Sequence, residues 1–147
     1  MLTIKVKSFD ALSTSELYHI LQLRSEVFVV EQDCVYQDLD GKDQKALHVI
    51  GYKNDKIVAY TRIFKPGDYF KESSIGRVVV SPATRKDGYG IEIMKASIKA
   101  VQENYSETII RISAQKYLLK FYSSLGFVQE GEEYLEDGIP HVAMLKS

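Results

Sequence analysis

The 147-residue chain predicts an α+β fold with a mixed β-sheet, because three kinds of local pattern alternate along it. Alternating apolar and polar residues indicate strands, apolar residues three or four apart indicate helices, and Asn54-Asp55 and Asp137-Gly138 indicate hairpin turns. The predicted order is β-α-β-β-β-α-β-α-β-β. A hydrophobic content of 45% at this length predicts a single domain, residues 1–147, with one core.

Each element is predicted from a local signal. The first strand alternates Ile4 and Val6 with lysines. Ser13 and Glu16, three residues apart, form a predicted capping box at the start of the first helix, and Gly126 is placed as the C-terminal cap of the last helix. The strand at 107–114 is rich in isoleucine and is expected to be largely buried. The predicted strands are 2–9, 46–53, 56–64, 78–80, 107–114, one that begins at Phe127, and 141–144; the predicted helices are one from Ser13 to about Val30, one that includes 91–101, and one that carries Tyr122.

The turn between the strand 78–80 and the following helix carries the main chemical signal. Gly88 and Gly90 have no Cβ, so the backbone there can adopt positive φ and lie close to a ligand. The first N–H groups of the helix stay unpaired, and together with the helix dipole they favour an anion. The spacing fits neither the P-loop nor the dinucleotide fingerprint, which needs a small residue where this chain has Ile93. A plain strand-to-helix turn without a ligand is the alternative that this turn by itself leaves open.

Two motifs in this order resemble the Gcn5-related N-acetyltransferase (GNAT) superfamily. Arg85-x-x-Gly88-x-Gly90 after a Val-rich strand resembles its acetyl-CoA loop. The run Phe-Tyr-Ser-Ser-Leu-Gly-Phe at 121–127 resembles its second hallmark, a helix that bears a tyrosine and closes on Gly-Phe. Residues 21–32, 37–43 and 132–141 are similar to the small ElaA-type branch, so the resemblance covers nearly the whole chain.

The resemblance implies a GNAT-like fold, in which a mixed central sheet is flanked by helices and two central strands splay apart to hold acetyl-CoA. The pantetheine arm would bond to backbone groups at Val78 and Val80. Lys86-Asp87 departs from the family pattern, since many members have a glycine followed by a basic or amide residue there. The expected cofactor-binding residues are Val78, Val79, Val80, Arg85, Lys86, Asp87, Gly88, Tyr89 and Gly90.

The resemblance also implies transfer of an acetyl group to a primary amine by direct attack in a ternary complex. Tyr122 matches the family's general acid, because a phenol within hydrogen-bond reach helps a thiolate to leave. Tyr117 and Phe121 are expected in the core. Glu31, His48 and His141 are the candidates for the base or the acceptor site, although an isolated histidine in a strand is more often structural. A non-catalytic acyl-CoA sensor or interaction domain is the alternative function.

The segment 31–43 is acidic and has no periodicity. A calcium loop is disfavoured, because aligning Gly41 with the loop glycine places Tyr36 and Leu47 at the two positions that need carboxylates, and no metal site is predicted. We expect Asp38 and Asp40 to form an electronegative rim that attracts a cationic amine; a solvated acidic loop is the alternative.

Charge and composition restrict the partners. A net charge of −1 without a block of Lys or Arg predicts no binding to nucleic acid or to anionic membranes, and favours small-molecule partners, here acetyl-CoA and an amine. The N-terminus has no signal-peptide pattern and no stretch approaches the roughly 18 apolar residues of a spanning helix, so a soluble cytoplasmic protein is expected. Cys34, the single cysteine, cannot form an internal disulfide, and without a fixed histidine partner it is a poor nucleophile. Oligomeric state is left open, with a homodimer as one alternative.

Overall fold

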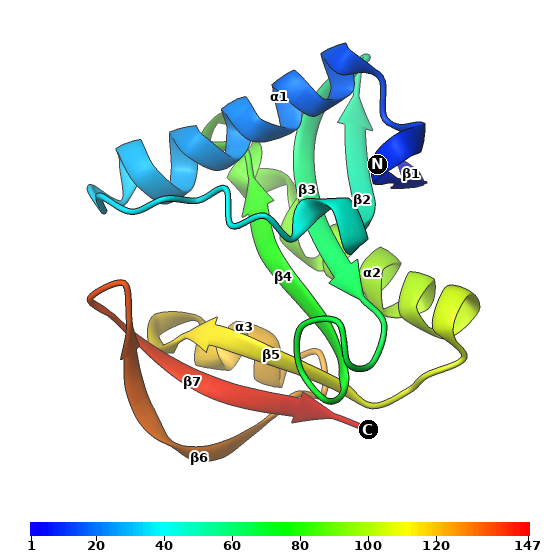
Figure 1. The fold of residues 1–147 in the computed structure, drawn as a ribbon. Coiled ribbons are helices and arrows are strands. Elements are labelled where there is room, and N and C mark those ends of the chain that lie inside the picture. The colour runs from blue at the N-terminus through cyan, green and yellow to red at the C-terminus, as the bar shows by residue number, and fades with distance from the viewer.

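A computed structural model describes residues 1–147 and contains one seven-stranded sheet in the order β1-β2-β3-β4-β5-β7-β6 (Figure 1). Only the β4–β5 pair is parallel, so the sheet is mixed, as predicted. None of the helices is long and apolar enough to cross a membrane. The strands are β1 (Thr3–Ser8), β2 (Leu47–Lys53), β3 (Lys56–Phe64), β4 (Ser73–Val80), β5 (Ile110–Gln115), β6 (Val128–Glu136) and β7 (Ile139–Lys146), and the helices are α1 (Thr14–Arg24), α2 (Tyr89–Tyr105) and α3 (Leu119–Ser123).

The predicted capping box begins α1. The Glu16 backbone N–H donates to Ser13 Oγ at 3.0 Å, and the Ser13 N–H donates to Glu16 Oε1 at 2.9 Å. After Arg24 the helix continues as a π-helical turn, η2 (Ser25–Glu31), so that helical structure ends close to the predicted boundary. Turns of this kind are frequent at functional sites.

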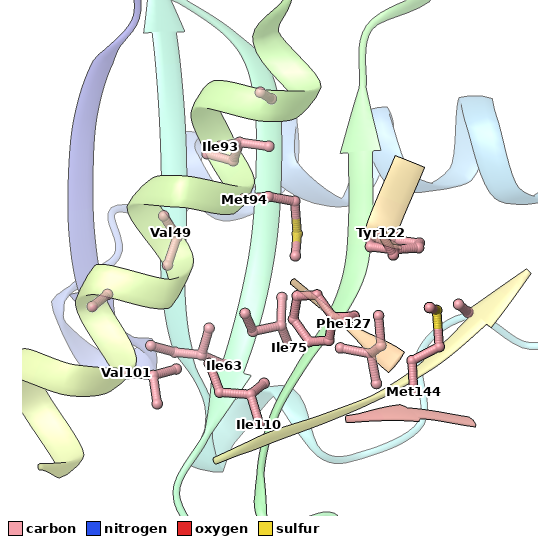
Figure 2. Packing of buried hydrophobic residues seen from close by; sticks show 14 of the residues in the cluster. Val49, Ile63, Ile75, Ile93, Met94, Val101, Ile110, Tyr122, Phe127 and Met144 are labelled. Atoms are coloured by element: carbon pink, nitrogen blue, oxygen red, sulfur yellow. The ribbon is translucent and has the colours of Figure 1, made fainter. Parts of the chain in front are cut away.

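The helices cover opposite faces of the sheet, because neighbouring residues of a strand point to opposite sides. Val49 of β2 packs in the main core with residues of α2 and α3, whereas Ile50, the next residue, packs against α1. Figure 2 shows the main core, with Ile93 and Met94 of α2 at one side and Tyr122 close to Phe127 at the other. The interior strand β3 is buried almost throughout as a result.

β4 and β5 pair only at one end and then diverge, as the resemblance implies (Figure 1). The paired residues are Ser73 with Ile110 and Ser74 with Arg111. Beyond them β4 contains a bulge at Arg77, which has a φ of 49°, where the register with β3 shifts. A bulge bends a strand, so the edge of β4 that faces β5 is left without backbone partners up to Val80.

Two sequence expectations on this side of the molecule are wrong. The strand predicted at 107–114 begins only at Ile110 and is buried on alternate residues, because the main core covers one face and the other face borders the space beside β4. Tyr117, expected in the core, is 75% exposed at the short turn before α3. Phe121 does pack against the main core.

Candidate functional site

Two cavities meet in the space between β4 and β5. The loop-side groove, about 390 Å³, reaches the glycine turn before α2, and the hairpin-side cavity, about 100 Å³, reaches the β6–β7 turn. Six residues border both, so the two spaces adjoin: Phe28, Gln32, Val78, Gln115, Leu118 and Tyr122. The groove is completed by Val27, Val79, Val80, Arg85, Gly90, Tyr117 and Phe121. The cavity is completed by Cys34, Tyr36, Ile75, Gly76, Arg77, Ile112, Ser113, Glu136, Asp137, Ile139 and His141.

The glycine turn has the conformation that its sequence predicts. A 3₁₀ turn, η4 (Pro82–Asp87), leads into Gly88, whose φ of 75° is accessible to glycine at little cost. No side chain caps the N-terminus of α2, so its first N–H groups remain available to an anion. A Cβ at Gly90 would lie 3.4 Å from the Phe121 ring, an ordinary van der Waals contact, so the packing of α2 against α3 does not by itself require a glycine there.

The other residues expected at the cofactor site differ in whether they border the groove and in whether their side chains are accessible. Val78 and Val80 border the groove on the unpaired edge of β4, and Arg85 borders it from the turn. Val79 also borders it, but its side chain packs against α1, and the Tyr89 ring is buried in the main core. Lys86 and Asp87 are exposed and border neither space. Because its ring is buried, Tyr89 can contribute only its backbone N–H to a bound cofactor.

Glu31 forms an ion pair with Arg85, which borders the groove. Its two carboxylate oxygens accept hydrogen bonds from the Arg85 guanidinium at 2.5 and 2.8 Å, and both side chains are partly exposed. The hydrogen bonds from Arg85 lower the pKa of Glu31. A carboxylate that is paired in this way, and that does not border the hairpin-side cavity, is a poor general base, so this part of the sequence interpretation is corrected.

Tyr122 lies where the groove and the cavity meet. Its side chain extends from α3, packs edge-on against Phe121 and Phe127, and is only 6% exposed. Burial raises its pKa above the ordinary value of 10, so the hydroxyl is protonated at neutral pH. It is a neutral proton donor placed beside both spaces.

His141 projects from β7 into the hairpin-side cavity. Its Nδ1 lies 2.7 Å from the Ile139 carbonyl oxygen, so Nδ1 carries a proton, and in the neutral imidazole Nε2 carries the lone pair. Nε2 lies 3.5 Å from Glu136 Oε2, and the Tyr134 ring stacks on the imidazole. Tyr122 and His141 both border this cavity, and a neutral His141 can accept a proton there.

His48 has a structural role. Its Nδ1 lies 2.6 Å from Tyr60 Oη, its Nε2 lies 3.0 Å from the Asp43 carbonyl oxygen, and the ring is almost completely buried. Burial lowers its pKa, and it borders neither space. His48 is therefore removed from the candidates for the base.

Asp38 and Asp40 do not form a free acidic rim. Asp38 lies 2.9 Å from Arg24 Nε and 2.8 Å from Arg77 Nε, the latter as an ion pair whose N–H is not aligned for a hydrogen bond. Asp40 lies 2.5 Å from Arg62 Nη2. The sequence interpretation fails because the arginines come from α1, β3 and β4, which only the fold brings together. We call the whole set the arginine–aspartate network: Arg24, Arg62, Arg77, Asp38, Asp40 and Asp43.

Several residues of the site were missed by the sequence analysis. The side-chain amides of Gln32 and Gln115 meet at 3.3 Å and join η2 to the end of β5 between the two spaces. Phe28, Gln32 and Glu136 lie in the stretches 21–32 and 132–141 quoted for the family resemblance, which was the one available signal. Arg77 gave no such signal, because its position depends on the β4 bulge.

Comparisons with known proteins agree on one family. The model of the acetyltransferase (GNAT) domain matches residues 11–147. Protein ElaA of Escherichia coli is 44% identical over 137 residues, which are 92% of this chain and 90% of ElaA. The crystal structure of E. coli ElaA superposes over both complete chains with a TM-score of 0.92 at 41% identity. An acyl-CoA N-acyltransferase from Pseudomonas aeruginosa superposes over both complete chains with a TM-score of 0.94 at 39% identity.

Proposed function

The chain belongs to the GNAT acetyltransferase family, and from this premise we propose that it transfers an acetyl group from acetyl-CoA to a primary amine by direct attack in a ternary complex. The observation that carries this proposal is the position of Tyr122 and His141 on the walls of one cavity that adjoins the larger groove. A proton donor and a proton acceptor therefore face the place where an amine and a thioester would meet.

The residues of the groove fit the donor substrate. The pyrophosphate would bind at the uncapped N-terminus of α2 beside Gly88 and Arg85, where free N–H groups and positive charge favour an anion. The pantetheine arm carries amide groups and would pair with the free backbone edge of β4 at Val78 and Val80. The thioester would then lie near Tyr122.

The reaction balances with two proton movements. The amine nitrogen attacks the acetyl carbonyl carbon, a C–N bond forms, and the C–S bond breaks. His141 Nε2 takes the proton that the amine loses, and Tyr122 supplies a proton to the departing sulfur. Burial raises the pKa of Tyr122, but the same surroundings also disfavour a charged thiolate, which makes that sulfur a better proton acceptor.

The proposal is tested in two steps. Acetyl-CoA should raise the melting temperature, since a ligand that binds only the folded state stabilises it by about 2.7 kcal/mol at a hundredfold excess over its dissociation constant. Gly88→Val should remove most of this shift, because a β-branched residue is strained at that φ. A screen of amines with acetyl-CoA, followed by release of free thiol above acceptor-free hydrolysis, then measures turnover.

Tyr122→Phe separates catalysis from binding. The ring that packs against Phe121 and Phe127 is kept and only the hydroxyl is lost, so folding and acetyl-CoA affinity should be unchanged. The value of kcat should fall by about 10²–10⁴-fold, the range of general acid catalysis. Binding of acetyl-CoA without turnover of any amine would instead favour an acyl-CoA sensor.

A further inference from the structure

We propose, on the basis of the function above, that the acceptor is an unbranched aliphatic amine that enters the hairpin-side cavity as an ammonium cation, and that Glu136 and Asp137 at the β6–β7 turn select it. Glu136 ends β6, and Asp137 is the first residue of the turn, with a φ of 53°. Both border the cavity that contains Tyr122 and His141. They are the acidic residues on its wall.

The charges on the cavity wall do not cancel. The one arginine that borders the cavity, Arg77, is already paired with Asp38 within the arginine–aspartate network, where three guanidinium groups meet three carboxylates. Glu136 accepts a hydrogen bond from Ser113 Oγ at 3.1 Å and approaches His141, but neither Glu136 nor Asp137 has an arginine or lysine partner. The cavity is therefore net negative and attracts a cation.

Ion pairing along β6 is partial. Glu130 is paired with Arg111 at 2.8 Å, and Glu133 is paired with Lys116 at 2.5 Å. Glu132 and Glu136 have no arginine or lysine partner, and of these two only Glu136 borders the cavity. A cationic ligand in the cavity would give this carboxylate a partner.

His141, whose Nε2 lies beside the Glu136 carboxylate, is the second group in the cavity on which the proposal rests. The His141 side chain is 8% exposed, and Nε2, the nitrogen that carries the lone pair, has only Glu136 Oε2 near it at 3.5 Å. In the neutral imidazole Nε2 is an acceptor, as the carboxylate is, so the two need a donor between them. An ammonium group has three N–H donors, so it can bind Glu136 and His141 Nε2 together. It gives its extra proton to Glu136, which leaves a neutral amine with a lone pair for the attack, and His141 Nε2 then takes the proton that the amine loses as the amide forms.

The shape of the cavity restricts the chain that carries the ammonium group. The cavity volume of about 100 Å³ is a quarter of that of the adjoining groove. Ile75, Ile112 and Ile139 supply apolar surface to its wall, and Glu136 and Asp137 supply the carboxylates. A cavity of this volume with both kinds of wall fits a short methylene chain with a terminal amine, and disfavours bulky branched or aromatic amines.

The test compares two probes with one variant. 1-Aminopentane is cationic at neutral pH, whereas aniline is neutral, and the ratio of their kcat/KM values reports selection for the cation. Glu136→Gln should lower this ratio at least tenfold through a higher KM for 1-aminopentane. In the natural protein, raising the salt concentration should raise the KM for 1-aminopentane but not the KM for aniline. In the variant, the KM for 1-aminopentane should rise much less with salt. Glu132→Gln, which removes an exposed carboxylate of β6 that does not border the cavity, is the matched control and should leave the ratio unchanged.

The outcomes separate this proposal from the proposed function. Turnover of both amines with the same ratio in Glu136→Gln as in the natural protein would overturn cation selection and leave the acetyltransferase assignment standing. An equal loss in Glu132→Gln and Glu136→Gln would overturn it as well, since surface charge alone would then explain the effect. Binding of acetyl-CoA without turnover of any amine would overturn the proposed function and this inference together.

Discussion

Two acidic segments of this chain resemble each other in sequence and differ in what they do. The segment that contains Asp38, Asp40 and Asp43 is matched by three arginines, and Arg24 at its centre is fully buried. The turn at Glu136 and Asp137 has no such partners and borders the cavity. The number of carboxylates therefore says less about function than whether cations from other elements neutralise them.

The largest effect on stability should follow from a substitution of Asp43 in the segment 38–43, which we call the matched segment because arginines neutralise its carboxylates. Asp43→Asn leaves the buried guanidinium groups of Arg24 and Arg62 without their shared carboxylate, now 2.8 and 2.9 Å away, and should cost about 3–5 kcal/mol in the free energy of unfolding. Urea unfolding measures this loss in the free energy of unfolding. Asp33→Asn, at an exposed carboxylate of the same acidic stretch, is the control and should change stability by less than about 0.5 kcal/mol. Equal stability of the two variants would mean that the network contributes nothing.

The second-largest effect should be a loss of stability in acid, caused by the same matched segment. Burial raises the pKa values of Asp40 and Asp43, but hydrogen bonds and charges from the arginines outweigh burial, and both pKa values lie below the ordinary 3.8. The folded state therefore binds fewer protons than the unfolded state, so this stability is present above pH 3.8 and is lost as the pH falls below it. Urea unfolding between pH 5 and 2.5 should show a steeper decline for the natural protein than for Asp43→Asn. Equal declines for the natural protein and Asp43→Asn would contradict the assignment of this acid sensitivity to the arginine–aspartate network.

Glu31 tests an intermediate case, a carboxylate in an exposed ion pair. Glu31→Gln should change the free energy of unfolding by at most about 1 kcal/mol, because both partners are partly exposed. Acetyl-CoA affinity should rise by up to about fivefold, since Arg85 would no longer leave a partner in order to bind phosphate. Titration of acetyl-CoA by calorimetry measures this change. Weaker binding would show that Glu31 positions Arg85 for the cofactor.

The smallest effect on stability is expected at the unmatched turn. Asp137→Asn should change the free energy of unfolding by less than about 0.5 kcal/mol, because Asp137 is exposed and asparagine tolerates its positive φ. The KM for 1-aminopentane should nevertheless rise by about two- to fivefold, the size expected for an exposed charge pair. Kinetics and urea unfolding of one preparation compare the two effects. A loss of stability with no change in KM would place Asp137 with the matched segment.

Local signals predicted most of the elements. The capping box at Ser13, the turns at Asn54-Asp55 and Asp137-Gly138, and the positive φ of Gly88 depend on residues close in sequence, and the structure has all of them. Tyr117 was misplaced because it lies in the short 3₁₀ turn Lys116–Leu118 before α3, and its neighbours in sequence do not determine which side of so short a turn faces the core.

The sequence alone determined the order of the elements, the family resemblance and the positions of the glycine turn and Tyr122, because each is encoded within a few consecutive residues. The tertiary structure decided which charged groups are neutralised. Arg24, Arg62 and Arg77 lie far apart in the chain and meet one acidic segment, while Tyr122 and His141 come from α3 and β7 to one cavity. Ion pairing and burial depend on distances between elements, which no local pattern specifies, so only the fold could assign Asp38 and Asp40 to the structure and leave Glu136 and Asp137 beside the cavity.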